Sequence, residues 1–70
     1  MGITMQFGRN LRIYRTQRQL SQEKLAEISG LHRTYISGLE RGIRNPSITI
    51  VAQLADALGI EPSALLERGP

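Results

Sequence analysis

The chain has 70 residues, no cysteine and a formal net charge of +3, which allows one small domain but excludes a disulfide scaffold and a thiolate metal site. No apolar run approaches the roughly 20 residues of a membrane helix and no signal-peptide pattern is present, so we expect a cytoplasmic protein. Residues 1–45 hold eight basic and three acidic side chains, a net charge of +5. Residues 46–70 hold one basic and three acidic side chains, a net charge of −2. The basic first half suggests a polyanionic partner, although scatter on a solvated surface would look the same.

A first helix is expected from about Met5 to Arg18. Phe7, Leu11 and Tyr14 follow the i, i+4, i+7 spacing of a stripe that packs into a core. Basic side chains interleave with this stripe, at Arg9, Arg12 and Arg15. The sequence therefore predicts an amphipathic helix near the start of the chain.

The next stretch, from about residue 22 to residue 41, has the pattern of helix, tight turn and helix. Ser21 can cap the first of these two helices, because its hydroxyl can accept a backbone N–H of the first turn. Gly30 can end that helix, since glycine adopts the left-handed conformation at little steric cost. The apolar stripe of this helix is expected to consist of Leu25, Ala26 and Ile28.

The second helix of this stretch should begin near His32 or Arg33 and run to about Arg41, with Gly42 as its stop. At about 100° per residue, Ile36 and Leu39 lie roughly opposite an arc without any large apolar group. Guanidinium and hydroxyl groups on such an arc can hydrogen-bond to the edges of DNA bases, and Gly38 leaves a gap where the backbone can approach a partner. An ordinary solvated face would have the same polarity. The arc consists of Arg33, Thr34, Ser37, Gly38 and Arg41, with Tyr35 on its flank.

A resemblance to a known family is carried by residues 20–42, LSQEKLAEISGLHRTYISGLERG. They resemble the lambda-repressor and Cro type of helix-turn-helix, also called the XRE family. The segment GLHRTYIS, followed by ERG and by Arg44-Asn45, is most similar to the controller proteins of restriction–modification systems. The resemblance covers about Phe7 to Leu66. It implies an all-α, compact, five-helix, lambda-repressor-like domain over residues 1–70, and a dimeric, sequence-specific DNA-binding regulator of transcription.

The resemblance places the second helix of the motif in the major groove of a double-stranded DNA operator. Arg33 is the expected contact to guanine, and Thr34 and Ser37 could bond bases or touch a thymine methyl. Tyr35 could pack against sugar and phosphate or at a deformable base step. Contacts to the DNA backbone are expected from Gln22, His32, Arg41, Arg44 and Asn45. Two of these have an alternative: Gln22 could simply favour helix, and His32 could have a purely structural role.

The resemblance also implies an ion pair inside the domain. In the family, an arginine at the position of Arg15 often pairs with the glutamate of the second motif helix, here Glu40. We expect this pair to join the first helix to the back of the second motif helix. The alternative is an arginine exposed to solvent.

After the motif, residues 42–46 should form a loop, because the residue before Pro46 disfavours helix. Ser47 can cap a fourth helix that runs from about Ile48 to Leu58. Gly59 should end that helix, and its apolar stripe is expected to consist of Ile48, Val51, Leu54, Ala55 and Leu58.

A last short helix should start at Glu61-Pro62, since proline suits the first turn of a helix. Its apolar side chains exceed what so small an element can bury. In controller-like proteins this end of the fold forms the dimer interface, which implies Ile60, Leu65 and Leu66 as contacts between two copies. The alternative is that these side chains close the core of the monomer, and for Leu65 we favour that alternative.

Other classes of function find less support in the residues. One histidine, no glycine-rich phosphate loop and no paired carboxylates argue against an enzyme, a metal site or a cofactor, and no small-molecule ligand is evident. RNA binding would call for exposed aromatic platforms, and two of the three aromatic residues belong to the predicted core. Two other regulators stay open: a phage-type repressor, and an antitoxin whose main partner is a toxin protein.

Overall fold

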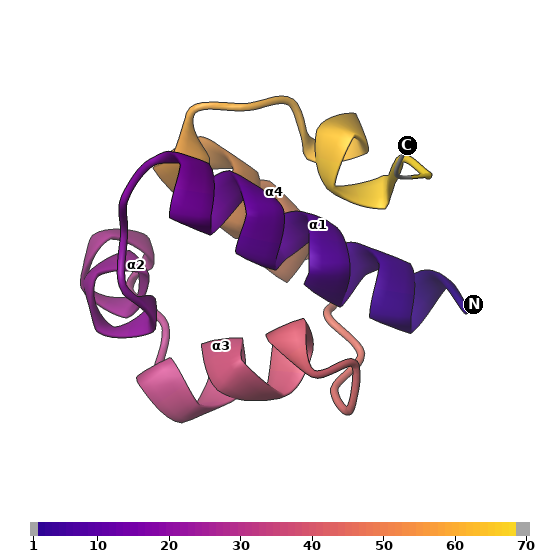
Figure 1. Ribbon diagram of the computed structural model, residues 1–70, viewed down its shortest axis with the longest axis horizontal. Coiled ribbons are helices and arrows are strands. Elements are labelled where there is room, and N and C mark those ends of the chain that lie inside the picture. The colour runs from indigo at the N-terminus through magenta and orange to yellow at the C-terminus, as the bar shows by residue number, and fades with distance from the viewer. Residues whose placement is uncertain (1, 69–70) are drawn as a thin grey trace.

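The computed structural model describes residues 2–68, and all of the regular secondary structure in that range is helical (Figure 1). Four α-helices follow one another along these residues: α1 (Ile3–Gln17), α2 (Gln22–Ser29), α3 (Arg33–Glu40) and α4 (Ile48–Leu58). A short 3-10 helix, η1 (Pro62–Leu66), comes last. Within the described range no helix is both long enough and apolar enough to cross a membrane. The all-α fold class is confirmed.

The expected count of five α-helices was wrong, because residues 2–68 hold four and the last helical segment is of the 3-10 type. Only Pro62–Leu66 is helical there, and Pro62 has no backbone N–H to donate. The N–H of Ala64 donates to the carbonyl of Glu61, three residues back, at 3.0 Å. Bonds of this spacing close a tight turn within a segment too short for α-helical pairing.

Local signals fix most of the helix ends. The hydroxyls of Ser21 and Ser47 accept the backbone N–H three residues further on, at 2.9 and 3.2 Å. Gly30 and Gly59 adopt φ angles of 78° and 69° and end α2 and α4 in the left-handed conformation. These predicted caps and stops are confirmed. The first helix begins at Ile3, two residues before the expected start.

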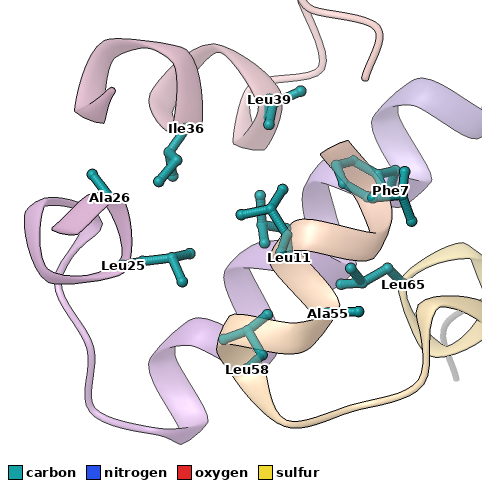
Figure 2. Packing of buried hydrophobic residues seen from close by; sticks show 11 residues of the cluster. Phe7, Leu11, Leu25, Ala26, Ile36, Leu39, Ala55, Leu58 and Leu65 are labelled. Carbon is teal, nitrogen blue, oxygen red and sulfur yellow. The ribbon is translucent and has the colours of Figure 1, made fainter. Parts of the chain in front are cut away.

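One apolar core lies between the helices (Figure 2). Two expected members lie outside it, since Ile28 is 47% exposed and Ile48 is 89% exposed. The buried stripe of α2 passes through Ser29, so Ile28 points about 100° away from that stripe. Ile48 lies in the opening turn of α4, ahead of the turns that pack on the core. The core side chains are Phe7, Leu11, Leu25, Ala26, Ile36, Leu39, Val51, Leu54, Ala55, Leu58 and Leu65.

Helices α1 and α3 cross with their backbones almost in contact at Gly8. A Cβ at this position would lie 2.1 Å from the carbonyl oxygen of Leu39 and 3.0 Å from that of Glu40. Only glycine permits this approach without a shift of one helix. Gly8 therefore fixes how closely α1 packs on the end of α3, a role that our sequence analysis missed.

A buried amide on α1 holds the end of the described chain. Asn10 is 6% exposed, and its Nδ2 donates to the backbone oxygens of Leu65 and Glu67 at 2.9 and 2.6 Å. Gln6 Nε2 donates to the backbone oxygen of Leu66 at 2.6 Å. These bonds join η1 to α1, and they bring Leu65 into the core while Leu66 stays 44% exposed.

Candidate nucleic-acid interface

The helix-turn-helix consists of α2, a short turn and α3. The turn closes when the backbone N–H groups of Gly30 and Leu31 both donate to the carbonyl of Ala26, at 2.9 and 3.1 Å. Ile36 and Leu39, on the inner side of α3, are fully buried against the core. The helix lies along one edge of the molecule (Figure 1), which leaves its other side available to a partner.

The outward arc of α3 forms as expected except at its centre. Arg33 and Thr34 are exposed at the start of the helix, and Ser37 is half-buried one turn later. Tyr35 is half-buried and packs against the core from the flank. The expectation that Gly38 leaves an open gap was wrong, because the side chain of Arg44 covers it and Gly38 is buried.

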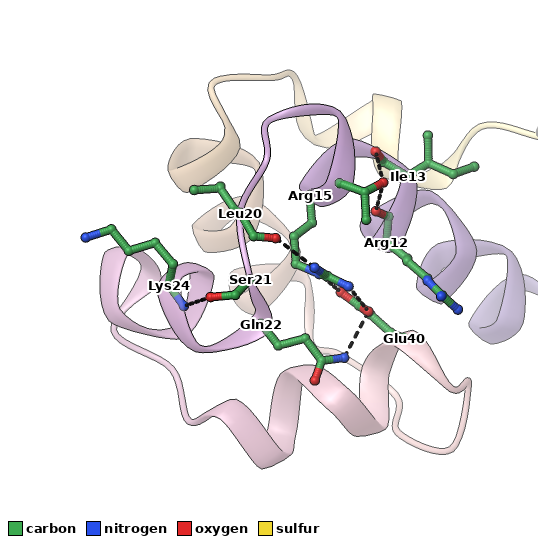
Figure 3. A network of polar contacts seen from close by, with 9 residues as sticks. Arg12, Ile13, Arg15, Leu20, Ser21, Gln22, Lys24 and Glu40 are labelled. Atoms are coloured by element: carbon green, nitrogen blue, oxygen red, sulfur yellow. Dashed lines mark hydrogen bonds and ion pairs between the residues drawn. The ribbon is translucent and has the colours of Figure 1, made fainter.

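The back of α3 is joined to the rest of the fold by a polar network (Figure 3). Arg15 Nε donates to Glu40 Oε2 at 2.6 Å, and Arg15 Nη2 donates to Glu40 Oε1 at 3.0 Å. Arg15 Nη1 donates to the backbone oxygen of Leu20 at 2.7 Å, at the turn before α2. The two charged side chains are 12% and 4% exposed. The pair implied by the family resemblance thus forms as a forked, largely buried ion pair.

The guanidinium of Arg15 stays charged until the pH becomes strongly alkaline. The hydrogen bond to Glu40 raises the pKa of the Arg15 guanidinium above its ordinary value, against the opposing effect of burial. A raised pKa means that the folded state holds this proton more tightly than the unfolded state. The contribution of the Arg15 proton to stability is therefore complete below the ordinary pKa of arginine, and it is lost at more alkaline pH.

Two residues expected to contact the DNA backbone are already held by neighbours. Gln22 Nε2 donates to Glu40 Oε1 at 3.0 Å, which leaves a second N–H on the same nitrogen for a phosphate. Thr4 donates its hydroxyl to Asn45 Oδ1 at 2.5 Å, which leaves the amide nitrogen of Asn45 to point elsewhere. Thr4 thus positions Asn45, a role that could not be predicted from the sequence because the two residues lie 41 positions apart.

The remaining expected contacts lie at the two ends of α3. His32 is the N-cap residue of α3, is exposed, and makes no capping bond with its side chain. Arg41 is the exposed C-cap residue. In residues 2–68 the ion pairs are those of Arg15 with Glu40 and of Lys24 with Glu27, so the arginines around α3 carry no paired carboxylate. Their charge is available to a polyanion.

The described residues bring together no cluster of three histidine, aspartate or glutamate side chains that could hold a metal ion. What they do bring together is a rigidly backed helix edged by hydroxyls and unpaired guanidinium groups. Such an arrangement can bond base edges and phosphate oxygens.

Comparison with known proteins gives consistent results. Residues 11–65 match the helix-turn-helix family model. The control protein C.SmaI of Serratia marcescens is 48% identical over 68 residues, which cover 97% of this chain and 81% of that protein. The crystal structure of the restriction–modification controller protein C.AhdI of Aeromonas hydrophila is 52% identical, covers 89% of this chain and 94% of its own, and superposes with a TM-score of 0.86.

A third similar protein was solved on DNA. The restriction–modification controller protein C.Esp1396I, a tetramer in complex with its natural 35 base-pair operator, is 29% identical. The match covers 93% of this chain and 86% of that one, with a TM-score of 0.85. The chain belongs to the XRE-type helix-turn-helix family, and restriction–modification controller proteins are among its relatives.

Proposed function

We propose that this protein is a sequence-specific, DNA-binding regulator of transcription that acts as a dimer and controls a restriction–modification system. The observation that carries the proposal is the contrast on α3. Its inner side is joined to α1 and α2 through Arg15, Gln22 and Glu40. Its outer side presents guanidinium groups that pair with no carboxylate of residues 2–68. The names of the relatives support the controller role.

The proposed reading residues lie on the exposed side of α3. Arg33 contacts guanine in the major groove, since a forked guanidinium matches the two acceptors of that base. Thr34 and Ser37 bond bases or touch a thymine methyl. Tyr35, on the flank, packs against sugar and phosphate or at a deformable base step.

The proposed backbone contacts fix the register on the duplex and carry no sequence information of their own. They come from the start of α2, the two ends of α3 and the loop after it. The residues are Gln22, His32, Arg41, Arg44 and Asn45. We propose no catalytic role, no cofactor and no metal.

The proposed dimer surface needs one revision. Leu65 is fully buried in the monomer, as expected if it closes the core, so the proposed interface relies on the other two residues. Ile60 is half-buried and packs against the core, whereas Leu66 is 44% exposed. Leu66 borders an apolar groove that also contains Ile3 and Ile48, which are 58% and 89% exposed. A second copy of this chain is the proposed occupant of the groove.

The function is tested by measuring binding of the purified chain to the DNA upstream of its own gene and to a scrambled duplex. We expect a clear preference for the upstream DNA and two half-sites about 10–11 base pairs apart, since a two-fold dimer places two reading helices one helical turn apart. A neighbouring toxin that binds far more tightly than any DNA would favour the antitoxin instead.

The dimer is tested separately by sedimentation. Ile48→Glu places a charge in the apolar groove and should shift the protein to monomer, while Ser63→Glu on the exposed side of η1 should not. An unchanged dimer in Ile48→Glu would place the interface elsewhere.

A further inference from the structure

Gly38 lies near the C-terminal end of α3, yet no open space lies beside it. A Cβ built at this position would lie 2.8 Å from Arg44 Cγ, 3.7 Å from Arg44 Nε and 3.7 Å from Ile43 Cγ1. The first distance is shorter than real Cβ contacts allow. The stem of Arg44 therefore lies in the space that a side chain at position 38 would occupy.

The end of α3 explains why Arg44 lies there. Gly42 adopts a φ of 75°, its N–H donates to the carbonyl of Leu39 at 3.1 Å, and the N–H of Ile43 donates to the carbonyl of Gly38 at 3.1 Å. This pair of bonds is a Schellman motif, which ends a helix and reverses the chain against its last turn. Arg44 follows directly, so its side chain returns across Gly38.

The head of the same side chain has a second support. Arg44 Cζ lies 5.9 Å from the centroid of the Tyr35 ring, one turn before Gly38 on α3. A guanidinium at this distance is attracted to the face of an aromatic ring. Arg44 is thus held at its stem by the glycine and at its head by the tyrosine, although it belongs to a loop.

We infer that Gly38 is a positioning residue that fixes Arg44 on the surface of α3, with Tyr35 as the platform for its guanidinium. A long side chain that is ordered before binding loses less conformational entropy when it meets DNA. The inference rests on the proposed function for its consequence, but the arrangement itself exists in the free protein. In this arrangement the side chain of Arg44 forms part of the surface of α3, although the residue itself belongs to the loop.

The first experiment needs no DNA. Proton resonances of the Arg44 side chain should be shifted upfield by the Tyr35 ring in the native chain, and Tyr35→Leu should remove that shift. Gly38→Ala should remove it as well, because the new methyl displaces Arg44 Cγ. Gly2→Ala is the matched control, since a Cβ there meets nothing within 4 Å. Identical Arg44 shifts in the native chain and in Gly38→Ala would overturn the inference, whether or not the protein binds DNA.

The second experiment measures the operator affinity of the native chain and of three variants: Gly38→Ala, Arg44→Ala and the double variant. We expect each single change to weaken binding by about tenfold, and the double variant to bind no worse than Arg44→Ala. Arg44→Ala lacks the Cγ that would collide with the new methyl, so Gly38→Ala has nothing left to displace. Equal further weakening in the Arg44→Ala background would show that DNA itself uses the space at Gly38, and would overturn the inference. Failure of the native chain to prefer its operator would instead count against the proposed function.

Discussion

The inner and outer sides of α3 differ in how their charges are used. On the inner side, Glu40 is 4% exposed and accepts bonds from both Arg15 and Gln22, so its charge is neutralised within the fold. On the outer side, the guanidinium groups of Arg33 and Arg41 are exposed and have no paired carboxylate in residues 2–68. One helix thus carries a charge that holds the structure together and charges that are left for a partner. Substitutions on the two sides should therefore affect different measurements.

The largest expected effect is on the inner side. Glu40→Ala leaves the largely buried guanidinium of Arg15 without its partner and should lower the free energy of unfolding by about 3 kcal/mol. Glu27→Ala is the matched control, because its pair with Lys24 is long, at 3.4 Å, and its side chain is 72% exposed. The control should cost about 0–1 kcal/mol. Urea denaturation of both variants measures the difference, and equal losses would mean that burial of the Arg15–Glu40 pair has no energetic consequence.

A double-mutant cycle measures the coupling between Arg15 and Glu40 directly. Arg15→Ala, Glu40→Ala and the double variant should show a coupling of about 1–3 kcal/mol, because each single change strands the other residue. Part of this coupling could pass through Gln22, which also bonds Glu40. Repeating the cycle in a Gln22→Ala background separates that part. A coupling near zero would contradict a direct energetic link between the two charges.

On the outer side, Arg33 and Arg44 should differ from one another. Arg33→Ala should cost about 1–3 kcal/mol on the operator and less on scrambled DNA, because it contacts a base. Arg44→Ala should weaken both DNAs alike and reduce the salt slope by roughly one per subunit, because it contacts a phosphate. Titrations of both variants at several salt concentrations test this. Equal losses on the two DNAs for Arg33→Ala would make Arg33 a phosphate contact.

The smallest effect is expected at Ser21, which caps α2 and lies on neither side of α3. Ser21→Ala removes the hydroxyl that accepts the N–H of Lys24 and should cost about 1 kcal/mol of stability. Operator affinity should be unchanged at temperatures where the variant is folded. Thermal melting and a titration at low temperature check the two statements. A large loss of affinity at low temperature would assign Ser21 to the interface itself.

The sequence predicted what depends on neighbours along the chain. Ser21 and Ser47 cap their helices, and Gly30 and Gly59 end them, because each acts on backbone groups within a few residues. The buried side of α3 followed from helical periodicity. The Arg15–Glu40 pair came from family resemblance, since nothing local joins residues 25 positions apart.

What the sequence missed depends on segments that meet only in the folded chain. Gly8 lies on the same face of α1 as Arg15, two turns away. Only glycine fits at this position because the carbonyl of Leu39 lies against it. The bonds of Asn10 could not be predicted from its neighbours, because its two acceptors lie more than 50 positions away. Gly38 was placed on the correct side of α3, yet the chain reversal that covers it with Arg44 could not be foreseen from spacing.

We propose that the outer side of α3 binds DNA through charges that no carboxylate of residues 2–68 pairs, and that it distinguishes one sequence from others. The most direct test is the affinity of the native chain for its upstream operator and for a scrambled duplex across a range of salt concentrations. We expect tighter binding to the operator, and a logarithmic salt slope on the order of −4 to −8 for the dimer, since each phosphate contact releases counterions. A slope near zero, or equal affinity for the two duplexes at every salt concentration, would contradict it.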